Sequence, residues 1–373
     1  MNFPFFFSGF SKKFLKSDIL SIEIGFTNIK VVHSRKTVGD SLKIINFGIN
    51  ATPQGCIKNG IISNFEGIAD NLREMIEYNN INEKNVKIVI SAGSNIVSKV
   101  IYINKHDKGK IEELIREETT RQLPVNIIDQ KMFYRVTGES ANQYKVLVTV
   151  VPNAMIDNYI KLLALLSFKP LSLEIPFSSV ARFFSRGFKI LEKSNSGSGR
   201  TIYNYGNGTI GVADLGSETT NLSIINNGAL EFNRIILSGG RSLDEVIGKK
   251  LGVDRKTAEV YKKMHGIVDD HHRGDDIERI VDECIREYVG EILRNIKRSI
   301  DFYINRCGGQ NLETVFFIGG GSGLKGLRRF GQNILQLPVY TIDMLDFSNI
   351  KFEKSLDKEK IRFLVNAVGI ALQ

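Results

Sequence analysis

The sequence has little cysteine, and none of it is arranged for disulfide or metal chemistry. Its three cysteines, Cys56, Cys284 and Cys307, are odd in number and far apart, without a C-x-x-C pair or zinc-ligand spacing. A disulfide framework and a structural zinc site are therefore excluded. Reduced thiols, as in a cytosol, are expected.

Long apolar runs are also missing. No stretch approaches the ~20 apolar residues of a membrane-spanning helix. The phenylalanine-rich start, Met1–Phe10, has no basic residues ahead of it and no small-residue cleavage site, so it does not predict a signal peptide. Lysines follow at 12, 13 and 16, which leaves membrane-surface contact as an alternative to the favoured interpretation, a short N-terminal tail over residues 1–17.

Familiar catalytic and nucleic-acid signatures are absent as well. There is no G-x-S-x-G, no P-loop and no Cys/His nucleophile pair. The net charge is +9, from 50 Lys+Arg against 41 Asp+Glu, but the basic residues are spread, so no nucleic-acid partner is expected. His271 and His272 lie in a polar stretch without further zinc-type ligands, which favours a solvated loop over a metal site.

What is present is enough chain for two domains. The 373 residues are 42% hydrophobic and 24% charged, typical of packed globular domains. A small, polar stretch at 193–208 predicts a linker or loop. It separates an expected first domain, 18–192 with a subdomain inserted at about 104–170, from a second, 209–373 with a helical subdomain at about 241–300.

One local pattern occurs in both halves of the chain. Residues 19–33 and 210–225 each predict a strand, a polar turn and a second strand. In each, an acid, Glu23 or Asp214, is followed by an apolar residue and glycine. One copy alone predicts only a tight hairpin; two copies indicate a duplicated domain.

Such turns suit a polyphosphate. Glycine lets the backbone approach a ligand, and turn N–H and hydroxyl groups can bind phosphate oxygens. An acid beside phosphate implies a cation, so Glu23 and Asp214 are predicted to hold magnesium through water. Lys30 is a candidate phosphate lysine, with a surface lysine as the alternative. The other predicted contacts in the two turns are Gly25, Phe26, Thr27 and Asn28, and Gly216, Ser217, Thr219, Thr220 and Asn221.

Further glycine-rich and charged segments extend this prediction. Gly319, Gly320, Gly321 and Ser322 follow an apolar strand and suit an adenosine, although a plain strand-to-helix turn is the alternative. Gly239 and Gly240 form a second glycine turn before a helix. Glu259 and Lys262, at i and i+3 of a helix, could bracket a ribose and purine or form an ordinary surface ion pair.

With these motifs in order, about residues 18–373 resemble the actin, heat-shock chaperone and sugar-kinase superfamily. Within it, the sequence looks most like the PilM family of type IV pilus assembly proteins, which is related to FtsA. The motifs that carry the resemblance are Ile22-Glu23-Ile24-Gly25 with Lys30, Asp214 to Asn221, Gly239-Gly240, Ala258-Glu259-Val260-Tyr261-Lys262, Gly319 to Gly323, and a closing helix from Asn366 to Leu372.

The resemblance implies an α/β fold of duplicated actin-like (ribonuclease H-like) domains with an interdomain nucleotide cleft, and ATP and Mg2+ as cofactors. It also implies a cytoplasmic scaffold that lies at the inner face of the cell membrane through its partners. The implied partners are the N-terminal cytoplasmic peptide of a PilN-like membrane protein, bound in a groove of the first domain, and other components of the pilus platform. Self-association is a further possibility of the family.

Glu23 departs from the family, which usually has Asp at this position. The extra methylene moves the carboxylate, and octahedral magnesium tolerates misplacement poorly. We therefore expect at most a slow ATPase. The alternatives are an FtsA-like division or filament protein, whose family carries an amphipathic membrane helix after the closing helix where this sequence ends at Gln373, and a small-molecule kinase, for which no catalytic base can be named.

Overall fold

The computed structural model describes residues 18–37, 41–90, 93, 95–105, 110–123, 129–193, 200–205, 208–268, 276–347, 349–353 and 357–373. The predicted N-terminal tail, the core of the predicted linker at 194–199 and the pair His271-His272 lie outside these residues.

The first half is built on a mixed sheet in the order β10-β6-β1-β2-β3-β19. Strand β1 is antiparallel to β2 and parallel to β6, and its residues from Ile19 to Ile24 are all buried, as expected for a central strand covered on both faces. One face carries α1 (Phe65–Tyr78) and α3 (Asn153–Leu165), the other α9 (Lys358–Ala371). The strands are β1 (Asp18–Ile24), β2 (Asn28–Lys36), β3 (Leu42–Ala51), β6 (Asn85–Val89), β10 (Lys169–Glu174) and β19 (Ile350–Phe352).

The second half repeats this sheet. Its order is β15-β14-β13-β16-β17, with β13 antiparallel to β14 and parallel to β16. The same connectivity, β3-β2-β1-β6-β10, runs through the first sheet, so the predicted fold of two duplicated actin-like halves is confirmed. The strands are β13 (Thr209–Leu215), β14 (Thr220–Asn226), β15 (Ala229–Ile236), β16 (Thr314–Ile318) and β17 (Val339–Thr341).

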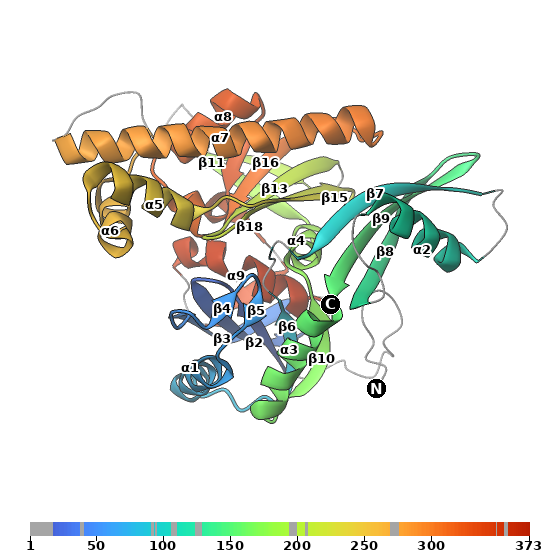
Figure 1. The fold of residues 1–373 in the computed structure, drawn as a ribbon, viewed down its shortest axis with the longest axis horizontal. Helices are drawn as coiled ribbons and strands as arrows, with labels where there is room; N and C mark the ends of the chain where they lie inside the picture. Colours follow the sequence, from blue (N-terminus) through green and yellow to red (C-terminus); the bar gives the residue numbers. More distant parts are fainter. Residues whose placement is uncertain are drawn as a thin grey trace.

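Helices cover the second sheet and extend from it, with α7 running along the outer side of the molecule (Figure 1). Asp254 begins α6 by accepting hydrogen bonds from the N–H groups of Lys256 and Thr257. No helix within the described residues is both long and apolar enough to cross a membrane. The helices are α5 (Gly240–Leu251), α6 (Arg255–His265), α7 (Asp276–Arg306) and α8 (Leu327–Leu335).

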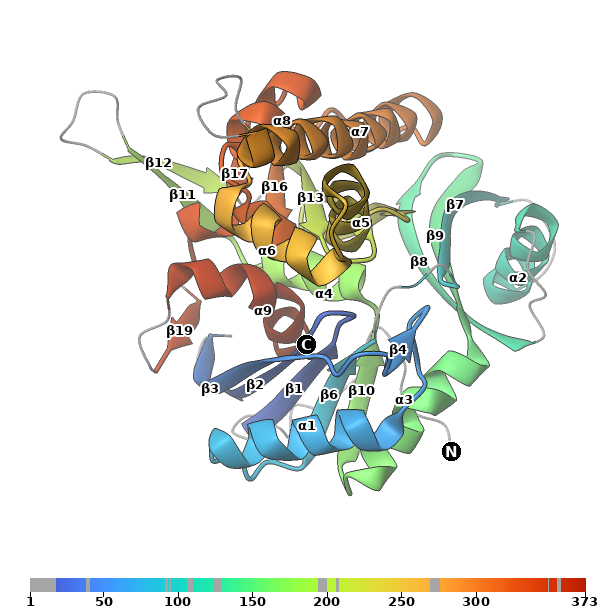
Figure 2. The same cartoon turned by 60° about the vertical axis from the view of Figure 1, so that its left-hand side comes forward.

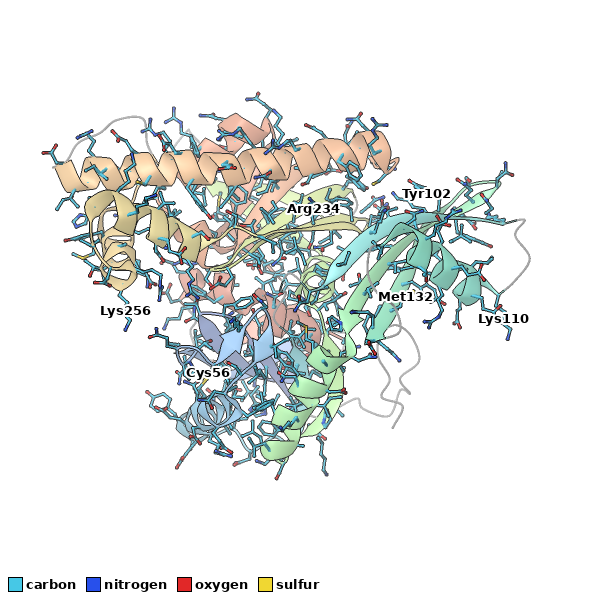
Figure 3. All side chains as sticks on the ribbon, in the orientation of Figure 1. Cys56, Tyr102, Lys110, Met132, Arg234 and Lys256 are labelled. Atoms are coloured by element: carbon cyan, nitrogen blue, oxygen red, sulfur yellow. The ribbon has the colours of Figure 1, made fainter. Side chains whose placement is uncertain are left out.

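A separate small sheet, which we call the insertion, projects from the side of the molecule. It has the order β7-β9-β8 with α2 against it and spans 97–152, whereas the prediction was about 104–170. The difference at the C-terminal end arises because α3 and β10 pack into the first half. In Figure 3, Tyr102 and Met132 lie on β7 and β8 of the insertion, at the opposite side from Lys256 on α6. Its elements are β7 (Val97–Asn104), α2 (Ile111–Gln122), β8 (Gln130–Glu139) and β9 (Gln143–Pro152).

The insertion is joined to the second half by a buried polar contact. Lys145 Nζ on β9 lies 3.2 Å from Glu231 Oε2 on β15, and the side chains of both are nearly nine-tenths buried. The hydroxyl of Tyr303 on α7 donates to the same oxygen at 2.7 Å. The insertion thus belongs to the first half in sequence, while the buried ion pair of its Lys145 is formed with the second half.

Helices α4 (Pro176–Phe184) and α9 lie between the two large sheets (Figure 2). They pack closely because Gly369 on α9 faces the backbone of Ser179 on α4, where a Cβ would be 2.1 Å from the carbonyl oxygen. The rings of Phe184 and Phe188 each lie 5.2 Å from that of Phe316 on β16. The halves therefore share an aromatic core.

Short elements complete the chain. A two-strand ladder, β4 (Ile57–Lys58) and β5 (Ile61–Ile62), follows β3. A small sheet in the order β12-β11-β18 lies beside the second half. Its strands are β11 (Phe188–Lys193), β12 (Arg200–Tyr205) and β18 (Leu345–Asp346), and 3-10 turns occur at Gly320–Gly323 and Ile342–Met344.

We predict that Phe184→Ala lowers the free energy of unfolding by about 3–5 kcal/mol, because it removes a buried ring from the core that joins the halves. Urea denaturation followed by circular dichroism measures the loss. Tyr78→Ala, which removes a ring that is 85% exposed, should change it by less than about 0.5 kcal/mol. Equal effects of the two variants would contradict a shared core at Phe184.

Candidate functional site

The first acid-bearing turn connects β1 and β2. The Gly25 N–H donates to the Asn28 carbonyl at 3.0 Å, and a Cβ at Gly25 would lie 2.9 Å from that oxygen, so the turn requires glycine. Thr52 follows the last residue of β3, and its hydroxyl donates to the Gly25 carbonyl at 2.7 Å. Within the turn, Phe26 is half-buried and Thr27 exposed.

The acid of this turn is paired with a lysine across the hairpin. Glu23 lies opposite Lys30 in the β1–β2 register, and Lys30 Nζ donates to Glu23 Oε1 at 2.9 Å. Both residues are buried. The predicted phosphate lysine is therefore held beside the predicted metal ligand.

The second turn, between β13 and β14, has the same geometry. The Gly216 N–H donates to the Thr219 carbonyl at 3.0 Å, and a Cβ at Gly216 would be 2.8 Å from that oxygen. Asp214 lies opposite Asn221, so Asn221 takes the place that Lys30 has in the first turn. The Thr220 hydroxyl donates to the Ser238 carbonyl at 2.9 Å, which leaves Ser217 and Thr219 as the turn's remaining hydroxyls.

The two turns meet at helix α9. Asn366 Nδ2 lies 3.3 Å from Glu23 Oε1 and 3.2 Å from Asp214 Oδ2. Glu23 and Asp214, the acids predicted to act together, thus come from different sheets and accept hydrogen bonds from the same side-chain amide.

The surroundings of Asp214 change its ionisation. Burial, reinforced by the negative charge of Glu23, raises the pKa of Asp214 to about 6. The Lys30 ammonium and the Asn366 amide act in the opposite direction but do not offset the burial. The ionised form of the Asp214 carboxyl is therefore unfavourable unless a further positive charge lies beside it.

The glycine-rich segment after β16 covers Asp214. Gly319 has φ +79°, and a Cβ there would lie 2.3 Å from Asp214 Oδ1, so only glycine fits. Its N–H donates to the Arg362 carbonyl on α9 at 3.0 Å. The Ser322 hydroxyl donates to the Gly319 carbonyl at 2.8 Å, and the predicted set Gly319, Gly320, Gly321 and Ser322 therefore lies next to the second turn.

The second glycine pair also lies against the second turn. The Gly240 N–H donates to the Gly216 carbonyl at 3.0 Å, and Gly239 packs on the backbone of Ser217. Lys262 on α6 reaches the same place, with Nζ 3.1 Å from the Gly240 carbonyl and 2.5 Å from Asp244 Oδ1.

Glu259 has different contacts from Lys262, the other residue of the predicted pair, which reaches the second turn. Its carboxylate pairs with Lys263 at 2.7 Å and lies 3.9 Å from Arg255 on the same helix. The hydrogen bond from Lys263 lowers the pKa of Glu259. Lys262 and Glu259 thus point to different partners.

No local sequence pattern predicts a role for Asn366, Asp244 or Thr52. The best signal for Asn366 is that it stands as a lone polar residue among buried apolar neighbours in α9, between Val365 and Ala367. Such a residue requires a hydrogen-bond partner. Its partners lie far away in sequence, so no local pattern identifies them.

The donor set fits a hydrated divalent cation. Among the residues that the structure describes, Glu23 Oε2, Asn221 Oδ1 and Asn366 Oδ1 are buried acceptor atoms without a hydrogen-bond partner. Water molecules on magnesium would supply O–H donors to such oxygens, and a divalent charge would offset the two carboxylates.

Two sheets of one connectivity, each presenting an acid-bearing hairpin to the other, define an actin-like protein. The ethanolamine utilization protein EutJ from Carboxydothermus hydrogenoformans shares this fold, with a TM-score of 0.55 and 14% identity over 95% of this chain and 89% of that one. The PilM-PilN type IV pilus biogenesis complex matches with a TM-score of 0.76 and 19% identity over 95% of this chain and 98% of that one. The family model for type IV pilus assembly protein PilM matches residues 21–373, and the chain belongs to this family.

We predict that Asp214→Asn flattens the pH dependence of stability of the metal-free protein. A pKa of about 6 in the folded state, against 3.8 in the unfolded state, means that the carboxyl's contribution is fully present below pH 3.8 and is lost as pH rises through 6. At pH 7 the variant should be more stable than the wild type by up to about 3 kcal/mol.

Urea denaturation in EDTA across pH 4–7 measures this difference. Asp70→Asn, on the exposed face of α1, is the control and should retain the wild-type slope. If Asp214→Asn also retained that slope, Asp214 would not be the strained carboxyl.

Proposed function

We propose that this chain binds ATP with Mg2+ between its halves and acts as an actin-like scaffold of the type IV pilus assembly platform. The observation that carries the nucleotide site is the approach of Glu23 and Asp214, from different sheets, to the amide of Asn366. Family membership supports the pilus role.

In this proposal, the residues around the two acids have distinct tasks. The backbone N–H groups and hydroxyls of the two turns bind phosphate oxygens, Lys30 adds a point charge, and Glu23 and Asp214 hold magnesium through water. Lys262 and Gly239-Gly240 position the second turn, while Gly319 to Ser322 support the adenosine. Glu259, which pairs with Lys263 on the same helix, is proposed to contact the ribose and purine.

Glu23 makes the proposed site a slow catalyst at most. Its longer side chain directs one oxygen to both Lys30 and Asn366, which fixes the carboxylate at a position set by these partners. Misplacement of a reacting group by about 1 Å can cost on the order of 100-fold in rate. Binding depends mainly on backbone groups and is less affected.

The proposed partner is the N-terminal cytoplasmic peptide of a PilN-like membrane protein. The solved complex that resembles this chain is one of PilM with PilN, and it supports the proposal at the level of the fold. Binding such a partner would place the chain at the inner face of the cell membrane, where further platform components and copies of itself could join it.

A cavity of about 220 Å³ is the proposed docking place for this peptide. Phe133 and Leu147 of the insertion, Phe177 and Ala181 of α4, and Leu230 of β15 give it apolar walls. Strand β8 forms an edge of the insertion sheet in the order β7-β9-β8. An extended peptide can pair with an edge strand and place an apolar side chain in an adjacent pocket.

The nucleotide site is tested by calorimetric titration of ATP in magnesium and in EDTA. We predict that wild-type protein binds ATP at least tenfold more tightly with magnesium, and that Asp214→Asn loses this difference because one of the two anionic ligands is gone. The exposed-site variant Asp70→Asn should behave as the wild type. Equal wild-type affinities with and without magnesium would remove the proposed site.

The partner site is tested with a fluorescent peptide from the N-terminus of a PilN-like protein. We predict that Phe133→Ala weakens binding at least tenfold, because it removes an apolar wall of the cavity. Val136→Ala, on the same strand but 42% exposed and not part of the cavity wall, is the matched control. Equal binding by the wild type and both variants would exclude this docking place.

A further inference from the structure

Asn366 occupies an unusual position between two carboxylates. It is only 5% exposed, and its amide nitrogen lies within hydrogen-bond distance of oxygens from both halves, 3.3 Å from Glu23 and 3.2 Å from Asp214. An amide nitrogen carries two hydrogens and can donate to both oxygens at once. The amide oxygen in the same place would face two acceptors, which assigns the nitrogen to this side.

The backbone that carries Asn366 is fixed on both sides. One turn earlier, the Arg362 carbonyl accepts a hydrogen bond from Gly319 of the second half. One turn later, Gly369 lies against the backbone of Ser179 on α4. Residues at this spacing share a helix face, so the face that bears Asn366 is clamped at both ends.

The remaining atom of the side chain points to a ligand. Among the described residues, Asn366 Oδ1 is a buried oxygen without a hydrogen-bond partner. Glu23 Oε2 is also buried and has no hydrogen-bond partner. A buried acceptor normally has a donor, and water bound to a cation would supply one to each.

We propose that Asn366 is a positioning residue that holds the carboxylates of Glu23 and Asp214 together, so that both would be available to a hydrated magnesium ion. This inference rests on the proposed nucleotide site. Asn366 opposes the mutual repulsion of the two anions with a shared donor, and its oxygen would be free to accept a hydrogen bond from water on the cation. Its amide donates to carboxylates of both halves, whereas the Lys30 ammonium donates its hydrogen bond to Glu23 of the first half.

The test compares the affinity for ATP in magnesium with that in EDTA, for wild type and variants, by titration calorimetry. Asn366→Ala should reduce the ratio of the two affinities by about tenfold or more, towards one, because a group that orients metal ligands is lost. Its affinity in EDTA should stay within about twofold of the wild type. Asn366→Ser keeps one donor and should give an intermediate ratio.

Asn233→Ala is the matched control. Asn233 is also a buried asparagine, but its amide donates to the Leu222 carbonyl at 3.1 Å within the second sheet. This variant should keep the wild-type ratio. Thermal melts in EDTA show whether each variant is folded, and Asn366→Ser carries the test if the alanine variant is not.

The outcomes separate the inference from the function on which it rests. If wild-type protein shows no magnesium dependence, the proposed nucleotide site fails. If it does, and Asn366→Ala or Asn366→Ser keeps the full wild-type ratio, the positioning role is wrong. Equal weakening in magnesium and EDTA would show a structural role only and would also overturn the inference.

Discussion

The structure depends on bringing two negative charges together at the contact between its halves. Glu23 and Asp214 are each the last residue but one of a central strand, and each strand is mostly buried because it lies in the middle of its own sheet. Two like charges at close range repel strongly in a medium that excludes water. Burial and, to a smaller extent, this repulsion raise the pKa of Asp214, and Lys30 and Asn366 offset the two effects only in part.

The surrounding fold is suited to carrying this electrostatic strain. Helices α4 and α9 pack against one another between the sheets, and the rings of Phe184, Phe188 and Phe316 bury apolar surface from both halves. Apolar burial is the main stabilising term in folding, and it is insensitive to the charge state of the acids. The apolar core can therefore hold the two halves in contact even though the two carboxylates repel each other.

The sequence predicts the parts of this arrangement that are local. An acid, an apolar residue and a glycine between two apolar strands determine a turn, and their recurrence shows the duplication. The pairing of Glu23 with Lys30 follows from hairpin register. Asn366 and Asp244 could not be predicted in the same way, because their partners are set by how helices pack on distant strands.

The insertion illustrates the same limit. The predicted bounds, about 104–170, begin near the end of β7 and continue through α3 into β10. The C-terminal bound is misplaced because α3 is amphipathic whether it packs on the insertion or on the first sheet. The prediction for Glu259 and Lys262 was limited by a related problem. Spacing places both on one helix face, but only the position of Asp244 on α5 draws Lys262 towards the second turn.

The contact of Lys145 with Glu231, to which Tyr303 also donates, ties the insertion to the second half. The insertion leaves the first half at Val97 and rejoins it at Pro152. The ammonium of its Lys145 is nevertheless paired with Glu231 of the second half. Breaking a buried ion pair by separation costs several kcal/mol. A rotation of one half against the other would therefore strain either this ion pair or the two joints by which the insertion is attached.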